Sequence, residues 1–259
     1  MIDAATFVGA WPFYSGGRGE ARDLLEMMDR EGIAHALVSP LNSVLLKDPE
    51  EGNEGLWRAV GAAQGRLLPV PCVNPVYPGW REVLERCAAR GAVGLRLHPN
   101  YHGYAVNGEP VKTLACECAA QHLLLVITVR MQDERQHHPA ARVGAVKIPE
   151  IAELIRCAEE QLSVLVSFAR LPEIMAMTRL AGRERLPYCD LAGVQGPESM
   201  WDQLTAAGMS GSLVFGSGWP LQYEQVALAK ARLMAMEDAV RSGVLHGNVE
   251  RLLRASGRG

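Results

Sequence analysis

The sequence lacks any long apolar run. Its longest largely apolar stretch, Leu123 to Val129, has seven residues, whereas a helix that spans a membrane needs about 20. The first residues carry neither the basic nor the apolar segment of a secretory signal peptide, so we expect no signal peptide. Dense blocks of Lys and Arg are also missing, and the formal net charge is −3. Neither a nucleic acid nor an anionic membrane is therefore expected as the main partner.

Cysteine is sparse and is not arranged for metal binding. The six cysteines lie mostly within apolar segments, at positions 72, 87, 116, 118, 157 and 189. This arrangement is typical of reduced thiols in the core of a cytoplasmic protein, and the cytoplasm is the location that we expect. Cys116 and Cys118 form a C-x-C pair, but no second pair accompanies them. The pair therefore does not indicate a zinc site.

Eight short aliphatic or β-branched segments recur along the chain and are predicted to be strands. They cover residues 2–8, 33–39, 67–73, 92–98, 123–130, 162–168, 187–191 and 212–216. Their nearly continuous apolar character favours strands that are buried on both faces, as in a parallel sheet with helical crossovers.

Amphipathic stretches alternate with these segments and predict helices. They cover residues 19–30, 53–63, 78–89, 110–120, 148–160, 172–181, 198–207, 222–240 and 244–254. Eight strands, each followed by a helix, give the count of a (β/α)₈ TIM barrel, whose usual length is about 250 residues. An open doubly wound sheet is disfavoured because no G-x-G-x-x-G motif or P-loop follows the first strand. With no linker or repeat visible, we expect residues 1–259 to form a single α/β barrel domain.

Charged side chains are predicted at the mouth of this barrel. Alternation along the strands puts four of them on inner faces near the strand ends: Arg96, His98, Arg130 and Arg170. The carboxyl ends of barrel strands carry the active sites of such enzymes, and unpaired buried charge is costly. Two interpretations stay open. The charges form either a solvated mouth that accepts anions or a layer of ion pairs with strand aspartates that closes the barrel.

Four stretches of sequence carry a family resemblance. They are MIDAATFVG, VGLRLHPN, LAGVQGPE followed by SLVFGSGWP, and GNVERLLR. In this order they resemble four parts of the amidohydrolase-related superfamily, in its decarboxylase-like, ACMSD-like branch. These parts are the opening D-x-H-x-H-x-G, the fourth strand, the last two strands with F-G-S-D-x-P, and the closing N-A-x-R-L helix. The resemblance covers nearly the whole chain and implies the TIM-barrel fold of a metal-dependent hydrolase.

The resemblance also implies a divalent metal, but the positions of its ligands hold other residues. The first two histidines of the family correspond to Ala5 and Phe7, and the histidines of strands five and six correspond to Thr128 and Phe168. The aspartate of strand eight, which in the family acts as base on the metal-bound water, corresponds to Gly218. This set offers too few donors for a divalent ion, so we expect no metal and no other cofactor.

Two polar loops at the predicted mouth suggest what replaced the metal. Arg96 and Arg130 would bind a carboxylate or phosphate through their guanidinium groups, and His98 would transfer a proton. The other candidates are Asp133 for proton transfer, Arg170 for substrate binding, and Asn100 and Tyr101 for substrate orientation. A solvated ion pair is the competing interpretation for Asp133.

These features predict a metal-independent hydrolase that acts on a small anionic, carboxylate-bearing substrate. The alternative is a catalytically degenerate pseudoenzyme that binds a small anion or a partner protein. A third interpretation is a decarboxylase or hydrolase with a metal site rebuilt from His98, His137 or His138 and an acidic neighbour. The aromatic segment from Trp11 to Tyr14 is a candidate lid or homodimer contact, and a simple hydrophobic plug is the equal alternative.

Overall fold

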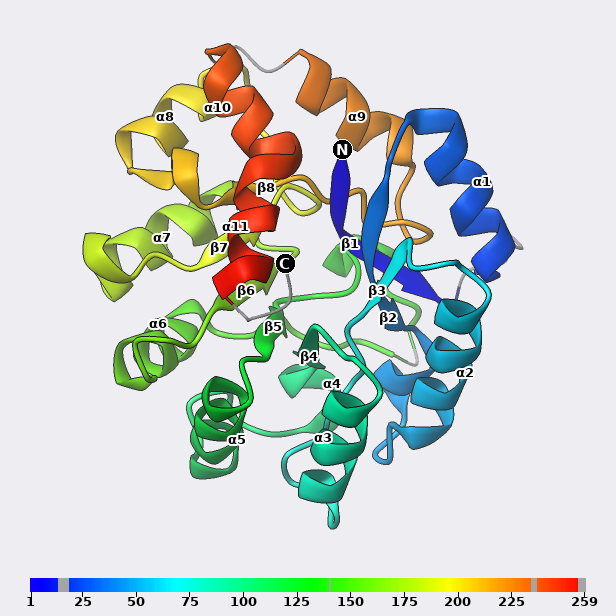
Figure 1. Cartoon of the computed structure of the whole chain (residues 1–259). Coiled ribbons are helices and arrows are strands. Elements are labelled where there is room, and N and C mark those ends of the chain that lie inside the picture. Colours follow the sequence, from blue (N-terminus) through cyan, green and yellow to red (C-terminus); the bar gives the residue numbers. More distant parts are fainter. Residues whose placement is uncertain (14–18, 140, 234–236, 256–259) are drawn as a thin grey trace.

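A computed structural model describes residues 1–13, 19–139, 141–233 and 237–255, with parallel strands at its centre and helices around them (Figure 1). The strands are β1 (Ile2–Val8), β2 (His35–Pro40), β3 (Leu67–Pro69), β4 (Gly94–Leu97), β5 (Leu124–Thr128), β6 (Val164–Ser167), β7 (Tyr188–Asp190) and β8 (Leu213–Val214). The helices are α1 (Ala21–Glu31), α2 (Glu50–Gly61), α3 (Trp80–Ala89), α4 (Pro99–His102), α5 (Glu109–Ala120), α6 (Ile148–Cys157), α7 (Leu171–Ala181), α8 (Met200–Ala206), α9 (Glu224–Arg232), α10 (Asp238–Ser242) and α11 (Asn248–Ala255). All eight strands predicted from the sequence are therefore confirmed.

Backbone hydrogen bonds close the strands into a ring. β1, β2 and β3 form one parallel sheet, and β4 to β8 form a second. At the junction of β3 with β4, Arg96 N donates to Pro71 O at 2.8 Å. At the junction of β8 with β1, Ala4 N donates to Phe215 O at 2.8 Å. The two sheets together complete the α/β TIM barrel that the sequence predicts.

Two strands are shorter than predicted because of their proline and glycine residues. β3 ends at Pro69 although the predicted strand runs to residue 73. Pro69 and Pro71 lack the N–H groups that a continuous ladder needs. β8 covers only Leu213–Val214 of the predicted 212–216, and Gly216 lies just beyond its end. Glycine weakens strand pairing because it has no side chain to pack.

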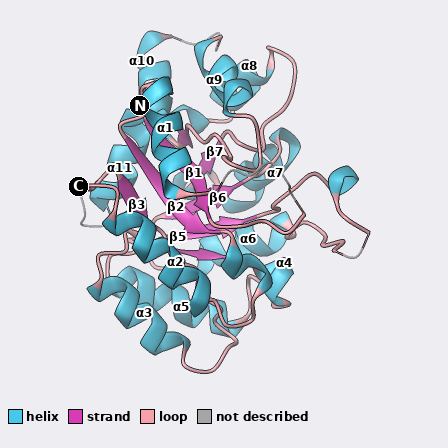
Figure 2. Cartoon of the chain, turned by 90° about the vertical axis from the view of Figure 1, so that its right-hand side faces the viewer, coloured by secondary structure: helices cyan, strands magenta, loops and turns pink. Residues whose placement is uncertain are grey.

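Apolar side chains and α11 fill the amino-terminal end of the barrel. The register of β1 against β2 shifts within β1, and Ile2 and Ala4 pack with Val126 in one interior cluster. Three residues of α11 belong to the same cluster: Val249, Leu252 and Leu253. Figure 2 shows α11 and α4 at opposite ends of the strands. The carboxyl end, where α4 lies, is therefore the end that is available for a functional site.

Local signals explain where several helices begin and end. Proline stands in the first turn of α5, α6 and α7, where its missing N–H has no helical partner to lose. α1 ends at Glu31 and is capped by Gly32, whose φ of 70° is the left-handed conformation of such caps. The prediction of one helix over 222–240 is wrong, because α9 ends at Arg232 and α10 begins at Asp238. α4 was not predicted. No helix in the described ranges is long and apolar enough to cross a bilayer.

Candidate functional site

An apolar cluster closes the carboxyl end of the barrel. We call it the mouth cluster, and its buried members are Ala5, Phe7, Trp11, Leu41, Val44, Met131, Phe168 and Ala192. The rings of Phe7 and Phe168 face each other with their centroids 6.0 Å apart. Trp11 packs edge-on against Phe13, with 5.8 Å between the ring centroids. The mouth cluster therefore occupies positions where the family resemblance implies metal ligands.

The residues at these positions do not fit a metal ion. Three of the five are apolar members of the mouth cluster: Ala5, Phe7 and Phe168. Thr128 supplies only a hydroxyl group, and that oxygen accepts a hydrogen bond from Arg96 Nη1 at 3.1 Å. Gly218 has no side chain. Among the described residues, no group of three or more His, Cys, Asp or Glu side chains could hold an ion.

The backbone at Phe168 is held in an unusual conformation. Its φ is +60°, in the left-handed region that bulky residues seldom adopt. Phe168 N donates to Asp190 Oδ1 at 3.2 Å, and Phe168 O accepts from Arg130 Nη1 at 3.0 Å. A side chain at Gly193 would place its Cβ 2.5 Å from the Phe168 carbonyl carbon, so this neighbour has to be glycine. These contacts fix the end of β6 at the edge of the mouth.

Arg96 lies inside the barrel and is fully buried. Its Nε donates to Ser39 Oγ at 2.7 Å, and its Nη1 donates to Thr128 Oγ1 at 3.1 Å and to Ser167 Oγ at 3.2 Å. The ring of Phe7 covers the guanidinium, with 4.8 Å between Arg96 Cζ and the ring centroid. Burial lowers the pKa of Arg96 to about 10, so the group stays charged at neutral pH. Its predicted role in anion binding stays a prediction.

Two buried aspartates share the interior with Arg96. Asp3 Oδ1 accepts hydrogen bonds from Ala5 N at 3.1 Å and from Ser217 N at 3.0 Å, whereas its Oδ2 has no partner. Asp190 Oδ2 also lacks a partner. Burial raises the pKa of Asp3 to about 7 and also raises the pKa of Asp190. Arg96 is buried beneath the mouth cluster and donates to three hydroxyl groups rather than to either aspartate, so both its solvated role and its ion-pair role stay predictions.

His98 is fully buried, and both of its ring nitrogens lack a hydrogen-bond partner. Burial lowers its pKa well below the ordinary value, and His102 and Arg96 lower it further. The imidazole is therefore neutral at pH 7, and a substrate would reach it only after the covering side chains move.

His138, a candidate for a rebuilt metal site, is exposed and stacks on Phe13 with the ring centroids 5.4 Å apart.

Arg130 and Arg170 lie at the rim of the mouth, each paired with a carboxylate. Arg130 Nη1 donates to Glu173 Oε2 at 2.7 Å, and Arg130 Nη2 donates to Glu173 Oε1. The same Oε2 accepts from Arg170 N at 2.8 Å at the start of α7. Asp133 accepts from Arg170 Nη2 at 3.2 Å and from Arg135 Nε at 2.9 Å. Hydrogen bonds from Arg135 hold the pKa of Asp133 below its ordinary range, so this carboxylate is a weak base.

Asn100 and Tyr101 make contacts within the fold. Asn100 Nδ2 donates to Gly144 O at 2.8 Å, which ties α4 to the segment after β5. Tyr101 packs edge-on against Trp11 with the centroids 6.2 Å apart. Their role in orienting a substrate stays a prediction. Because Trp11 is buried, it does not offer an exposed homodimer contact. Tyr14 lies outside the described residues.

A small polar recess remains beside the mouth cluster. It has a volume of about 40 Å³ and is lined by Arg130, Met131, Gln132, Asp133, Phe168, Arg170, Gly193, Gln195 and Gln222. The Nε of Arg130 is buried and has no hydrogen-bond partner. Sequence reasoning did not select Glu173, Gln195 or Gln222. Gln195 and Gln222 follow the last two strands in loops at the functional end of the barrel, and that position is the signal that could have found them.

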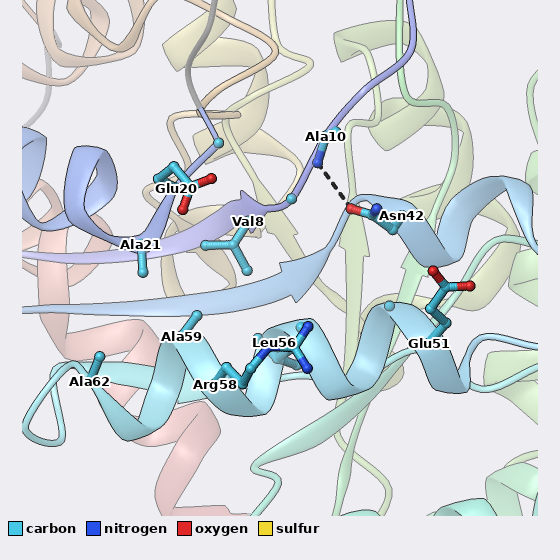
Figure 3. Close-up of a pocket in the computed structure, with 14 residues that line it drawn as sticks. Val8, Ala10, Glu20, Ala21, Asn42, Glu51, Leu56, Arg58, Ala59 and Ala62 are labelled. Carbon is cyan, nitrogen blue, oxygen red and sulfur yellow. Dashed lines mark hydrogen bonds between the residues drawn. The ribbon is translucent and has the colours of Figure 1, made fainter.

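A larger cleft lies away from the barrel axis. Its volume is about 470 Å³, and it runs between the start of α1, one face of α2 and the segment after β2. Figure 3 shows Glu20, Arg58 and Glu51 along it, and the bond of 2.9 Å from Ala10 N to Asn42 Oδ1 at one edge. None of the residues that the sequence predicts for the site lines this cleft.

Comparisons with known proteins agree with this architecture. The family model described as amidohydrolase matches residues 17–255. A probable 2-pyrone-4,6-dicarboxylic acid hydrolase from Acinetobacter baumannii, solved with citric acid bound, is 13% identical over 98% of each chain, with a TM-score of 0.70. A 2,6-dihydroxybenzoate decarboxylase from Rhizobium is 12% identical over 98% of each chain, with a TM-score of 0.75. A 5-carboxyvanillate decarboxylase from Sphingomonas paucimobilis is 15% identical over 98% of each chain, with a TM-score of 0.73. A search of the curated proteins found no match.

The structural likeness extends over nearly the whole chain, and at this low identity it shows the fold alone. The family match is independent of it and also covers most of the chain. It confirms the resemblance that the sequence motifs carry. The chain therefore belongs to the amidohydrolase family.

Proposed function

We propose that this amidohydrolase-family barrel binds a small carboxylate at its mouth without the metal-dependent hydrolysis implied by the resemblance. The observation that carries the proposal is the recess beside Arg130, whose Nε is buried without a hydrogen-bond partner. Leaving a buried donor unsatisfied costs about 1–3 kcal/mol. A ligand oxygen would remove that cost, because it supplies the missing acceptor.

The recess suits a carboxylate in both size and chemistry. Its volume of about 40 Å³ is enough for a group of a few atoms. The side chains of Gln132, Gln195 and Gln222 line it and offer amide donors, and Arg130 supplies a guanidinium. Amide and guanidinium N–H groups are the usual donors to carboxylate oxygens. The rest of the ligand would extend toward solvent.

Binding without turnover has more support than metal-independent hydrolysis. The residues at the metal positions do not fit an ion. His98 is fully buried, and Asp133 is an ion-paired carboxylate with a lowered pKa. A good general base needs access to its substrate and a pKa near the working pH. The catalytic roles of His98 and Asp133, and the cytoplasmic location, stay predictions.

The names of the structural relatives support the class of ligand. They include a dicarboxylic acid, a dihydroxybenzoate and a carboxyvanillate. These compounds differ in their rings but share the carboxylate group. We therefore infer that this chain kept the carboxylate-binding mouth of its relatives, although other residues occupy the positions of the metal ligands.

Isothermal titration calorimetry with benzoate, 2,6-dihydroxybenzoate and citrate tests this proposal, and benzamide serves as the neutral counterpart of benzoate. We expect saturable binding of at least one carboxylate and no binding of benzamide. Gln222→Leu removes an amide of the recess and should weaken binding about tenfold, a loss of about 1.4 kcal/mol. Gln203→Leu, on the exposed surface of α8, is the matched control and should leave binding unchanged.

Two results would contradict the proposal. One is the failure of every carboxylate to bind, and the other is an equal effect of the Gln222 and Gln203 substitutions. Nuclear magnetic resonance spectra of the same mixtures should show intact ligand. Hydrolysis of benzamide to benzoate and ammonia that is lost in His98→Ala would support the metal-independent hydrolase instead.

A further inference from the structure

An ion pair borders the recess beside the mouth cluster. Arg170 Nη2 donates to Asp133 Oδ2 at 3.2 Å, and both side chains line the recess. Glu134 Oε2 lies 3.6 Å from Nη1 of the same guanidinium. Both terminal nitrogens of Arg170 therefore face carboxylates of the chain itself, at the edge of the space that the proposed ligand would enter.

The ion pair joins the segments that follow two neighbouring strands, β5 and β6. Asp133 precedes a short turn of 3₁₀ helix, Glu134–Gln136, in the connection between β5 and α6. Arg170 directly precedes α7, which begins at Leu171. Connecting segments move more readily than the elements that they join. Asp133 is therefore the partner that can withdraw when another carboxylate arrives.

The neighbouring pair of Arg130 with Glu173 is less easily opened. The side chain of Arg130 is 7% exposed, and both of its Nη atoms donate to Glu173. In the other pair, Arg170 is 38% exposed and Asp133 is 22% exposed. Breaking a buried pair leaves an uncompensated charge, whereas a pair that solvent reaches contributes little to stability. A ligand would therefore open the pair of Asp133 with Arg170.

The charges around the recess cancel. The network contains as many guanidinium groups as carboxylates, namely those of Arg130, Arg135 and Arg170 and those of Asp133, Glu134 and Glu173. A further carboxylate thus enters a neutral site. It gains attraction from a guanidinium only where a carboxylate of the chain gives that group up.

We propose that Asp133 competes with the ligand of the recess for the guanidinium of Arg170, an inference that rests on the proposed function. The recess is small, so a carboxylate that accepts from Arg130 Nε also lies close to Arg170. In the absence of ligand, the carboxylate of Asp133 occupies the place on Arg170 that the ligand's carboxylate takes. Asp133 thus limits the affinity of the site, and Arg170 becomes a ligand-binding residue when the pair opens.

Calorimetric titration of the full chain with benzoate and citrate tests this competition. Asp133→Asn keeps a side-chain oxygen that can accept from Arg135 N, as Asp133 Oδ1 does at 3.0 Å, and it removes the charge that holds Arg170. We expect this variant to bind the carboxylate about fivefold more tightly than the wild type. A residue that contacts the ligand or transfers a proton would give weaker or unchanged binding, and that result overturns the proposal.

Two further variants show whether the gain acts through Arg170. Glu150→Gln also removes one negative charge, but from an exposed pair with Lys147 outside the recess. This matched control should change the dissociation constant by less than about twofold. In an Arg170→Gln background, Asp133→Asn should no longer tighten binding, because the guanidinium for which the two carboxylates compete is gone. A gain that persists in that background overturns the proposal.

The same titrations separate this competition from the proposed function. Failure of every carboxylate to bind either the wild type or Asp133→Asn overturns the proposed function, and the competition falls with it. A wild type that binds a carboxylate, together with an Asp133→Asn variant that binds it no more tightly, overturns the competition alone.

Discussion

Asp3, Asp190 and Arg96 place two carboxyl groups and one guanidinium out of contact with solvent. Burial makes a charged carboxylate costly, and one proton shared by the two aspartates would leave the three groups electrically neutral. The pKa of Asp3 is raised from 3.8 to about 7, so Asp3 is the group that holds this proton below neutral pH. The coupling with Asp190 acts in the same direction.

The free energy of unfolding should therefore fall as the pH rises from about 4 to about 7. In this window the folded chain binds a proton at Asp3 that the unfolded chain, with its ordinary pKa of 3.8, has released. The contribution of Asp3 is complete below pH 4 and is lost above pH 7. Urea unfolding at several pH values measures the slope.

Asp3→Asn should flatten this dependence and stabilise the protein above pH 7 by about 1–4 kcal/mol. The asparagine Oδ1 can still accept the hydrogen bonds from Ala5 N and Ser217 N. An Asp3→Asn variant with the same slope as the wild type would show that another group is responsible.

Gly218 has a backbone conformation that does not suit the family's aspartate. Its φ is +72°, and an added Cβ would lie 3.0 Å from the Gln222 side chain. Gly218→Asp should therefore lower the free energy of unfolding by about 1–2 kcal/mol, and Gly218→Ala should lower it similarly. Gly61→Ala in α2, where nothing lies within 4 Å, is the control and should be neutral or stabilising. A stable Gly218→Asp variant that binds zinc would contradict this view of the mouth.

At the scale of single elements, hydrophobic patterning was enough to predict the strands but not their ends. β1 occupies the predicted range, residues 2–8. β3 stops early at Pro69, because proline supplies no N–H to the ladder. α4 has only four residues and no repeated apolar pattern, so periodicity could not reveal it. Local sequence thus predicts an element well where its apolar pattern extends over many residues and where no proline interrupts it.

The start of α7 depends on Glu173. This carboxylate pairs with Arg130 and accepts a hydrogen bond from Arg170 N. Burial raises its pKa, and hydrogen bonds from the two arginine residues lower it by more. Glu173→Ala would leave a nearly buried Arg130 without its counter-charge, so we expect a loss of about 2–4 kcal/mol in chemical unfolding. Glu150→Ala, which removes an exposed pair with Lys147, should cost less than about 1 kcal/mol. Equal losses in the two variants would refute this role.

For the whole molecule, the sequence predicted the barrel and the altered metal positions, and it was less informative about the new mouth. Strand alternation identified Arg96 and Arg130 as interior or rim charges. It could not show that Phe7 covers Arg96, or that Glu173 in α7 pairs with Arg130. These contacts join segments that are far apart in the chain, and their geometry follows from tertiary packing.

The purified protein should contain much less than one equivalent of zinc, manganese or iron. The donor set at the mouth lacks imidazole and carboxylate groups at the positions that the family uses. Inductively coupled plasma mass spectrometry measures the content, and a thermal melt with and without EDTA measures any contribution to stability. A stoichiometric metal whose removal lowers the melting temperature would contradict the prediction.

The division of the barrel into two sheets has a consequence for its internal motions. β1 to β3 come from one continuous amino-terminal stretch, and three backbone hydrogen bonds at each of two junctions join their sheet to β4 to β8. Contiguous segments tend to open as cooperative units. Amide hydrogen exchange should therefore reveal two protection levels, with β1 to β3 exchanging together and before β5 and β6. The unit β1 to β3 would then separate transiently from β4 to β8 at the two junctions. Phe7 belongs to the first unit and Phe168 to the second, so the mouth that they seal would open during this separation.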